Sequence, residues 1–434
     1  MTRRSAAPLV ADLAQALLGV PLPLGLRCWD GSQVEGPPGS PTLVVRSPRA
    51  LRRFVYAPDE LGLARAYVSG ELDIEGDLYA ALRVPDALAE RPGLRLDRRA
   101  LRPLVADLIR SGVLGWPVPP PEEEARLRGR RHSPRRDRAA IGHHYDVGNA
   151  FYRLLLGPSL VYSCAYYETP ATTLTDAQQA KLDLVCRKLD LRPGMRLLDV
   201  GCGWGSLVLH AAATYGVHAV GVTISAEQAE LARRRIAKAG LDAQVEIRLQ
   251  DYRDVTDGPY DAIASVGMAE HVGRDQFPVY AAGLHALLTP GGRLLNHAIA
   301  RGPDAGPDRP DTRSFLTRYV FPDGELQPLS DHVGFLERAG FEVRDVEGLR
   351  EHYALTTRAW FRNLEDHWEE AIRLVSPGRA RVWRLYLASA ALAFERRRVG
   401  INQIVATTAD TAGRAADAWP LRRPDWSRAS TGPQ

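Results

Sequence analysis

Lysine is scarce in this 434-residue chain, which otherwise carries many basic residues. It occurs only at Lys181, Lys188 and Lys238, and every other basic side chain is arginine. Arginine suits bidentate phosphate binding, but a GC-rich genome produces the same bias without any function. Acidic residues nearly balance the basic ones, so the formal net charge is only +4. The chain as a whole is therefore not a polycation, and we expect no nucleic-acid partner.

Cysteines and long apolar runs are also few. No run of 18 apolar residues exists, so we expect no transmembrane helix. Arg3-Arg4 precedes an apolar stretch over 13–26, but polar residues and prolines interrupt it and no small-x-small cleavage site follows. An amphipathic N-terminal helix and a cytoplasmic location are the expectation. No metal-ligand spacing or C-x-x-C pair is formed by the cysteines, which favours reduced thiols: Cys28, Cys164, Cys186 and Cys202.

The length exceeds that of one ordinary domain, and the composition is that of a globular protein, with 45% apolar and 25% charged residues. Residues 1–115 are expected to form a small α+β unit without catalytic residues. A strand is predicted at 42–46, followed by helices at 48–54 (capped by Ser47), 61–69 and 78–89. The segment 70–76 is interpreted as a turn-rich connection.

The composition changes abruptly over 116–139, which we interpret as a linker. Prolines at 117–121 precede three glutamates and then a run of arginines. Proline stiffens such a segment and like charges extend it. A solvated connector is the simplest interpretation. Binding to anionic lipid headgroups is a second, since each basic residue near the surface contributes about 1 kcal/mol. Nucleic-acid binding lacks support because no aromatic residues alternate with the charges.

From residue 140 to about 415 strand and helix patterns alternate, which is typical of an α/β doubly wound parallel sheet. The tail over 416–434 is expected to be flexible. Strands are predicted at 196–200, 218–223, 245–249, 260–266, 293–299 and 341–347. Helices are predicted at 176–189, 206–215, 226–239 and 276–288, with more after 354.

A glycine-rich turn follows the first of these strands, in the segment Leu197–Gly205. Ligands bind at the carboxyl ends of the strands in such sheets, and glycine lets the backbone approach them closely. The second strand ends in Thr223-Ile224-Ser225, without the acidic residue that dinucleotide folds place on the ribose, which argues against NAD. Ser225 and Gln228 have the spacing of a helix capping box.

Four further segments accompany the turn in order: 142–152, 162–167, 250–254 and 267–273. With the turn and 221–228, they resemble the cyclopropane fatty acid synthases, S-adenosylmethionine (SAM)-dependent methyltransferases of unsaturated lipid chains. The resemblance spans about 140–405 and implies a class I SAM-dependent methyltransferase fold. Adjacent His143 and His144 point apart on a helix, so we expect no metal site. The cofactor residues that it implies are Tyr162, Ser163, Asp199, Gly201, Gly203, Trp204, Gly205, Thr223, Gln228, Gln250, Asp251 and Tyr252.

The resemblance also implies a reacting centre. An isolated alkene is a poor nucleophile, so the protein must hold it dry and aligned with the methyl donor. Ring closure then requires loss of a proton, which the family achieves with a bound bicarbonate ion. Glu270 would accept the proton of that ion, His297 and Tyr353 would donate to its oxygens, and backbone groups of Cys164 and Ile299 would complete the cradle. In this interpretation Cys164 is not a nucleophile.

One position departs from the family pattern: Ala390 replaces a cysteine that many members carry, which argues against a mechanism through that thiol. Aromatic residues Trp204, Tyr319, Phe321 and Trp360 either flank a cation or form core, and we favour core.

The leading hypothesis is a cyclopropane-fatty-acyl-phospholipid synthase that acts on unsaturated phospholipid. Peripheral membrane association, a lipid-binding N-terminal unit and a homodimer are implied by the resemblance. The alternative is a methyltransferase that leaves a methylene or methyl branch, working with a partner reductase. A non-catalytic lipid carrier and an RNA methyltransferase are the remaining alternatives.

Overall fold

A computed structural model describes residues 4–89, 105–125, 136, 147–302, 313–409, 419 and 426. The chain forms two compact units. The first contains Met1–Arg126, Asp311–Val320 and Ser376–Ser389, and the second contains the rest. Two later segments therefore join the unit that we expected to end at residue 115. Residues 142–146 of the segment 142–152, and most of the tail 416–434, lie outside the described residues.

The first unit is built on a four-stranded sheet with the order β2-β1-β3-β4. The β1 strand is parallel to β3, and the other neighbours are antiparallel. Its strands are β1 (Gly25–Cys28), β2 (Gln33–Val34), β3 (Thr42–Val45) and β4 (Leu72–Glu75). Its helices are α1 (Ala6–Leu18), α2 (Pro48–Tyr56), α3 (Glu60–Val68), α4 (Leu78–Ala89), α5 (Val105–Arg110), α13 (Phe315–Tyr319) and part of α17 (Pro377–Glu395).

One sequence expectation for this unit is confirmed and another is wrong. The expected N-terminal helix is present as α1, which ends before Gly19 (φ 71°), and the rest of the apolar stretch 13–26 leads into β1 at Gly25. The segment 70–76 is not only a turn, because its centre pairs with β3 as strand β4. Leu72 and Ile74 alternate with Asp73 and Glu75, a two-residue period that suits a strand at the edge of a sheet.

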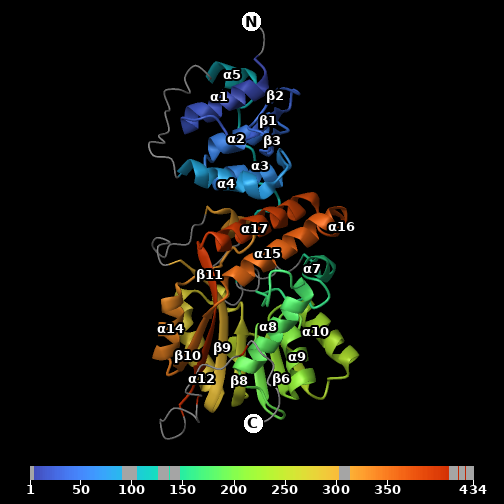
Figure 1. Ribbon diagram of the computed structural model, residues 1–434, viewed down its shortest axis with the longest axis vertical. Helices are drawn as coiled ribbons and strands as arrows, with labels where there is room; N and C mark the ends of the chain where they lie inside the picture. The colour runs from blue at the N-terminus through green and yellow to red at the C-terminus, as the bar shows by residue number, and fades with distance from the viewer. Residues whose placement is uncertain are drawn as a thin grey trace. The chain divides into compact units, whose positions relative to one another are not determined.

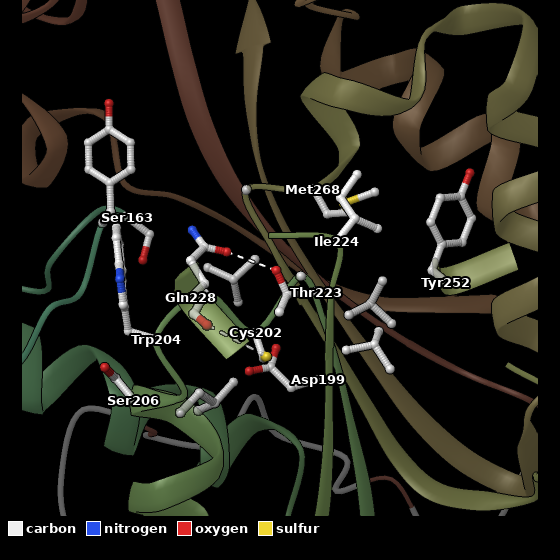
Figure 2. A pocket seen from close by; sticks show the side chains of 18 of the residues that line it. Ser163, Asp199, Cys202, Trp204, Ser206, Thr223, Ile224, Gln228, Tyr252 and Met268 are labelled. Atoms are coloured by element: carbon white, nitrogen blue, oxygen red, sulfur yellow. Dashed lines mark hydrogen bonds between the residues drawn. The ribbon is translucent and has the colours of Figure 1, made fainter. Parts of the chain in front are cut away.

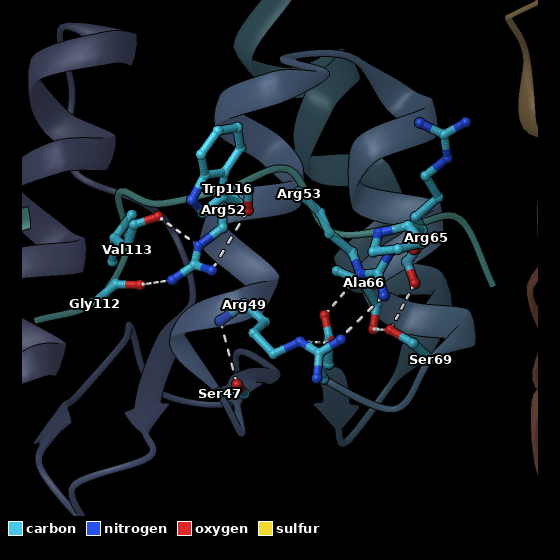
Figure 3. Close-up of polar contacts among 12 residues, drawn as sticks. Ser47, Arg49, Arg52, Arg53, Arg65, Ala66, Ser69, Gly112, Val113 and Trp116 are labelled. Atoms are coloured by element: carbon cyan, nitrogen blue, oxygen red, sulfur yellow. Dashed lines mark hydrogen bonds and ion pairs between the residues drawn. The ribbon is translucent and has the colours of Figure 1, made fainter.

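The helix α2 begins as expected at Ser47, whose hydroxyl accepts a hydrogen bond from the Arg49 N–H at 3.2 Å. Two arginines of this helix hold neighbouring segments in place (Figure 3). Arg52 donates to the carbonyl oxygens of Gly112 and Val113, and Arg53 forms an ion pair with Glu71 at 2.7 Å. The Arg52 contacts fix the segment after α5 against α2, and the Arg53 ion pair fixes the residue before β4 against the same helix.

The segment 116–125 is the described part of the predicted linker: several of its residues are exposed, but Glu124 anchors it. Glu124 is only 5% exposed and accepts two hydrogen bonds from the Arg65 guanidinium, each 2.7 Å long. The hydroxyl of Tyr319 donates to the same carboxylate at 3.3 Å. Most of the arginine run lies outside the described residues, although Arg136 pairs with Asp323 at 2.7 Å.

The second unit contains a seven-stranded sheet with the order β10-β11-β9-β8-β5-β6-β7. Its strands are β5 (Arg196–Val200), β6 (His218–Thr223), β7 (Val245–Leu249), β8 (Tyr260–Val266), β9 (Leu288–Arg301), β10 (Glu342–Gly348) and β11 (Val399–Thr407). The first four have the predicted bounds, and β9 extends beyond 293–299 at both ends. The prediction missed β11, which is antiparallel to both β9 and β10, so the sheet is mixed rather than wholly parallel.

Helices cover both faces of this sheet (Figure 1). Successive strand residues point to opposite faces: Leu197 packs with α8, α9 and α10, whereas Leu198 packs with α12 and α14. The two cores therefore share the same strands. The helices of this unit are α7 (Asn149–Leu156), α8 (Leu174–Lys188), α9 (Ser206–Tyr215), α10 (Ala226–Ala239), α11 (Ala269–Val272), α12 (Phe277–Ala286), α14 (Leu329–Arg338), α15 (Arg350–Asp366) and α16 (Trp368–Leu374).

Two tryptophans of the C-terminal tail contact cations of the second unit. The ring of Trp419 lies 4.7 Å from the Arg293 guanidinium and 5.2 Å from that of Arg344. The ring of Trp426 lies 5.6 Å from the Lys188 ammonium. Within the described ranges, no helix is both long and apolar enough to cross a membrane, and no cluster of side chains has the composition of a metal site.

Candidate active site

A cavity of about 150 Å³ opens at the carboxyl ends of β5, β6, β7 and β8 (Figure 2). This is the edge where ligands bind in open α/β sheets. Every cofactor residue that the sequence predicted lines the cavity except Gly205. Residues that the sequence analysis did not assign to the site also line it, among them Lys181, Met268 and His271.

The glycine-rich turn between β5 and α9 forms one wall of the cavity. Gly201 and Gly203 adopt φ values of 80° and 53°, which disfavour residues with a Cβ. The N–H of Gly201 is held by the Val222 carbonyl oxygen at 3.0 Å, so the turn is tied to β6. Gly205 has a different role, because it begins α9 and a Cβ there would lie 3.2 Å from that of Ala232.

Thr223, at the end of β6, organises the next part of the wall. Its hydroxyl donates to Oε1 of Gln228 at 2.8 Å and accepts the N–H of Ser225 at 3.2 Å. Ser225 caps α10 by accepting the Gln228 N–H at 3.4 Å, as the sequence predicted. The Gln228 side chain contacts Thr223 instead of returning to Ser225, so its amide group is fixed at the cavity wall.

Aromatic rings form a third part of the site. The Trp204 ring lies 4.7 Å from Tyr152, and its Nε1 donates to Oδ1 of Asn149 at 2.7 Å. Tyr162 continues this group, with its ring 5.6 Å from Tyr152 and 5.2 Å from Trp360. The Trp360 ring also lies 5.9 Å from that of Tyr353. Trp360 thus connects a cavity residue with a residue of the predicted reacting centre.

The segment after β7 supplies the remaining predicted cofactor residues. Gln250 donates to the Asp254 carbonyl oxygen at 2.8 Å. Asp251 forms an ion pair with Arg253 at 2.6 Å, which balances both charges inside this segment. The Tyr252 ring packs edge-on against Tyr280 at 5.5 Å.

Lys181 and Asp199 are charged residues in the cavity wall, and each is only 2% exposed. Burial raises the pKa of Asp199 to about 7, an effect that the nearby Lys181 partly offsets. Burial also lowers the pKa of Lys181 to about 8, against the influence of Asp199. The ammonium of Lys181 donates to the Ser163 hydroxyl at 2.9 Å. The sequence signal that singles out Lys181 is the rarity of lysine.

Glu270 and Ile299, two residues of the predicted reacting centre, are in direct contact. The Ile299 N–H donates to Oε1 of Glu270 at 2.8 Å, so this N–H already has an acceptor. The other carboxylate oxygen, Oε2, is buried without a hydrogen-bond partner among the described residues. Burial raises the pKa of Glu270 to about 7, and the Ile299 N–H opposes the shift.

His297 lies two residues earlier on β9 and is 1% exposed. Neither ring nitrogen has a hydrogen-bond partner within the part of the chain that the structure describes. Burial holds its pKa well below the usual value, and the charges of Lys181 and Lys188 lower it further. The imidazole is therefore neutral, so one nitrogen is a donor and the other an acceptor.

Cys164 and Tyr353 are linked to this strand through Leu349. The Cys164 thiol donates to the Leu349 carbonyl oxygen at 3.7 Å, and the Tyr353 N–H donates to it at 3.1 Å. The Leu349 N–H donates to the Ile401 carbonyl oxygen. Ile401 on β11 lies opposite Ile299 on the neighbouring strand β9. Backbone, thiol and carboxylate contacts thus connect Cys164, Tyr353, Ile299 and Glu270, whereas the His297 ring takes no part in them. None of the five residues lines the cavity. Burial raises the pKa of the Cys164 thiol, which argues against a thiolate nucleophile.

The other aromatic candidates lie in different surroundings. Tyr319 belongs to the first unit, where it contacts Glu124, so its role there is structural. Phe321 lies 6.1 Å from the ring of His271, a cavity residue.

Comparison with known proteins identifies the family and agrees with the fold. The family described as mycolic acid cyclopropane synthetase matches residues 132–404. A probable fatty acid methyltransferase of Mycobacterium tuberculosis is 42% identical, covering 93% of this chain and 95% of the relative. The cyclopropane-fatty-acyl-phospholipid synthase of Escherichia coli is 40% identical over 60% of this chain and 66% of its own length.

A solved structure extends the comparison to three dimensions. The mycolic acid cyclopropane synthase CmaA1, solved in complex with SAH and CTAB, is 33% identical. It matches 62% of this chain and 98% of its own length with a TM-score of 0.59. The chain therefore belongs to the mycolic acid cyclopropane synthetase family and is a SAM-dependent methyltransferase that acts on fatty acyl chains.

Proposed function

We propose that this enzyme converts a cis double bond in an unsaturated phospholipid chain into a cyclopropane ring. The observation that carries the proposal is the pair of buried groups, Oε2 of Glu270 and the His297 ring, that have no hydrogen-bond partner among the described residues. An unsatisfied buried polar group costs about 1 to 3 kcal/mol. Two such groups on contacting elements, Glu270 on α11 and His297 on β9, are expected to serve a bound ion or a reacting group.

The cavity fits SAM as the methyl donor. The turn at Gly201 and Gly203 admits close approach of a ligand, and Thr223 and Gln228 present fixed polar groups beside it. Tyr162, Ser163, Asp199, Trp204 and the segment 250–252 would hold the remainder of the molecule. When bound, SAM supplies an electrophilic methyl group on its sulfonium.

The unsatisfied groups fit bicarbonate, which supplies a weak base when bound. Oε2 of Glu270 is an acceptor and would hold the hydroxyl hydrogen of the ion. The neutral His297 ring would donate to one of its oxygens. Tyr353 is connected to Ile299 and Glu270 through Leu349 and would supply a phenol donor. The Ile299 N–H instead orients the Glu270 carboxylate through Oε1, so we assign it a positioning role.

Trp360 and Tyr162 are suited to the space between the cavity and this centre. Trp360 is 0% exposed, and its ring lies between those of Tyr162 and Tyr353. Aromatic faces attract positive charge, and they exclude water from a cation that water would consume. We propose that these rings shield positive charge that develops on the acyl chain.

A surface of the first unit supports peripheral association with membrane. Trp116 is 89% exposed, and the nearby Tyr56 hydroxyl donates to the Gly115 carbonyl oxygen at 2.7 Å. Arg52 donates to the Trp116 carbonyl oxygen at 3.5 Å (Figure 3). Tryptophan and tyrosine favour the membrane interface, and arginine attracts anionic lipid. We propose that this surface contacts the lipid; a homodimer stays a prediction.

Product analysis tests the proposed reaction. The purified enzyme is incubated with SAM and liposomes of mono-unsaturated phospholipid, and the acyl chains are then examined by mass spectrometry and proton NMR. Upfield cyclopropane protons on a chain heavier by one CH2 are the expected result. A methylene or methyl branch of the same added carbon would favour the alternative methyltransferase, and no mass gain would contradict phospholipid as the substrate.

Liposome flotation tests the membrane surface. Trp116→Ala is expected to reduce binding to anionic liposomes, while turnover of a detergent-dispersed substrate stays unchanged. Exposed Leu374→Ala in the second unit is a matched control for loss of an apolar side chain. Equal binding of Trp116→Ala and wild type would exclude this surface as the contact.

A further inference from the structure

The few lysines of this chain are not placed at random. Lys181 and Lys188 lie seven residues apart on α8, so both project from the same side of the helix. They are 2% and 0% exposed, whereas Lys238 on α10 is exposed. Lysines are rarely buried without a specific partner. Each of the two buried ammonium groups therefore requires an explanation.

Lys188 has a structural explanation. Its ammonium contacts the Glu347 carboxylate and donates to Oε1 of Gln403 at 2.7 Å, which joins α8 to β10 and β11. Lys181 differs, because among the described residues its one hydrogen-bond acceptor is the Ser163 hydroxyl, at 2.9 Å. An ammonium group carries three donor hydrogens. Lys181 also lines the cavity, which Lys188 does not.

The contact with Lys181 determines what Ser163 can do. The Ser163 oxygen accepts from the ammonium, so its own hydrogen must donate to another atom. Ser163 lines the cavity, and its side chain lies above the Trp204 side of the pocket in Figure 2. A hydroxyl that accepts from a cation is a stronger donor, because hydrogen bonds in a chain polarise one another. Ser163 is thus prepared to donate to an anionic ligand group.

The charges around the cavity indicate which ligand group this is. Asp251 and Arg253 neutralise each other across 2.6 Å. Lys181 and Asp199 are the other buried acid and base of the wall, and no described residue donates a hydrogen bond to the Asp199 carboxylate. A ligand end with both a carboxylate and an ammonium complements such a pair. The amino acid end of SAM has this chemistry.

We propose that Lys181 is a positioning residue for SAM that acts through Ser163, directing the Ser163 hydroxyl to the carboxylate of the amino acid end. This inference rests on the proposed use of the cavity for SAM. A compact ammonium on a slender stem suits the buried position better than the broader guanidinium that the chain uses at nearly all its other basic positions.

Ligand pairs test the inference without turnover. S-adenosylhomocysteine (SAH) carries the amino acid end, whereas 5′-methylthioadenosine lacks it, and calorimetry measures the dissociation constant of each. Lys181→Met is expected to weaken SAH binding about 10- to 100-fold, the usual range for a hydrogen bond to a charged group. Binding of methylthioadenosine is expected to change less than about twofold. Equal weakening of both ligands would overturn the proposal.

Ser163 variants separate positioning from a structural role. Ser163→Ala is expected to weaken SAH binding as much as Lys181→Met does, whereas Ser163→Thr is expected to retain SAH binding. The double variant Lys181→Met with Ser163→Ala is expected to bind SAH no more weakly than either single variant. Additive losses would overturn the relay through Ser163. If Lys181→Met does not fold, the comparison of Ser163→Ala with Ser163→Thr decides the question.

Two controls complete the design. Lys238→Met removes an exposed lysine, and Lys188→Met removes a buried one outside the cavity. Both are expected to keep the wild-type ratio of SAH to methylthioadenosine affinity, and a changed ratio in either would count against a specific role for Lys181. Failure of the wild type to bind SAH would instead overturn the proposed function itself.

Discussion

Oε1 of Glu270 accepts a hydrogen bond from the Ile299 N–H at 2.8 Å, which ties α11 to β9. The contact orients the carboxylate and leaves Oε2 buried without a partner among the described residues. His297 lies on β9 with Ile299, and both of its ring nitrogens are also buried without a hydrogen-bond partner among the described residues. Such groups lower stability, so their presence together is better explained by chemistry than by folding.

The Glu270 carboxyl is expected to make stability depend on pH. Burial raises its folded-state pKa from 4.5 to about 7, so the folded protein holds this proton more tightly than the unfolded chain does. The resulting stability is complete below pH 4.5 and is lost as pH rises through 7. Between pH 5 and 8 the free energy of unfolding of the wild type should fall by about 2 to 3 kcal/mol more than that of Glu270→Gln. Urea unfolding at both pH values measures the difference.

The amide in Glu270→Gln keeps an oxygen for the Ile299 N–H but does not ionise, so its own pH dependence should be flatter. Exposed Glu337→Gln is the matched control and should follow the wild type. Parallel pH dependence in wild type and Glu270→Gln would show that the carboxyl does not titrate in this range.

Thr223→Val should weaken cofactor binding. The substitution keeps the branched shape but removes the hydroxyl that holds both Gln228 and the Ser225 N–H. We expect a loss of about 1 kcal/mol in stability and about a tenfold weaker affinity for SAH, measured by calorimetry. Exposed Thr214→Val on α9 should change neither quantity. Unchanged affinity in Thr223→Val would mean that the Gln228 amide orientation does not matter for the ligand.

Glu124→Ala should destabilise the first unit strongly. It removes the carboxylate that accepts from Arg65 and Tyr319 and leaves a partly buried guanidinium without its partner. Loss of one member of a buried pair costs about 3 to 5 kcal/mol, and the lower value applies because Arg65 is partly exposed. Thermal unfolding measures the effect. Exposed Glu122→Ala should be neutral, and a neutral Glu124→Ala would restore the solvated-connector interpretation.

Local pattern was sufficient to predict the centre of the sheet. The runs at 196–200 and 260–266 are apolar, short and bounded by turns, so their bounds agree with β5 and β8. Strand β11 was missed because Asn402 and Gln403 interrupt its apolar pattern. Gln403 accepts a hydrogen bond from the Lys188 ammonium, a contact that the local sequence does not reveal. The burial of Glu124 was missed for a similar reason: its partners, Arg65 and Tyr319, are remote in sequence.

In the site too, local sequence pattern predicted some features, whereas contacts between remote segments determine others. Most of the predicted cofactor residues follow strand ends, where sequence alone indicates ligand binding, whereas Tyr162 and Ser163 lie between α7 and α8 and were predicted from the resemblance. All but Gly205 line the cavity. Lys181 was not predicted because its contact with Ser163 joins two segments that lie apart in sequence. The roles of Glu270, His297 and Tyr353 stay predictions until variants are measured.

Turnover of Glu270→Gln and His297→Ala, measured beside SAH binding, tests the reacting centre most directly. Neither residue lines the cavity, so both variants should bind SAH within about twofold of the wild type. Both should lose at least about 100-fold in the rate of cyclopropane formation on mono-unsaturated phospholipid, since positioned proton transfer contributes about 100- to 10,000-fold. Near-normal rates in both variants, with SAH binding intact, would contradict the assignment of Glu270 and His297 to the reaction.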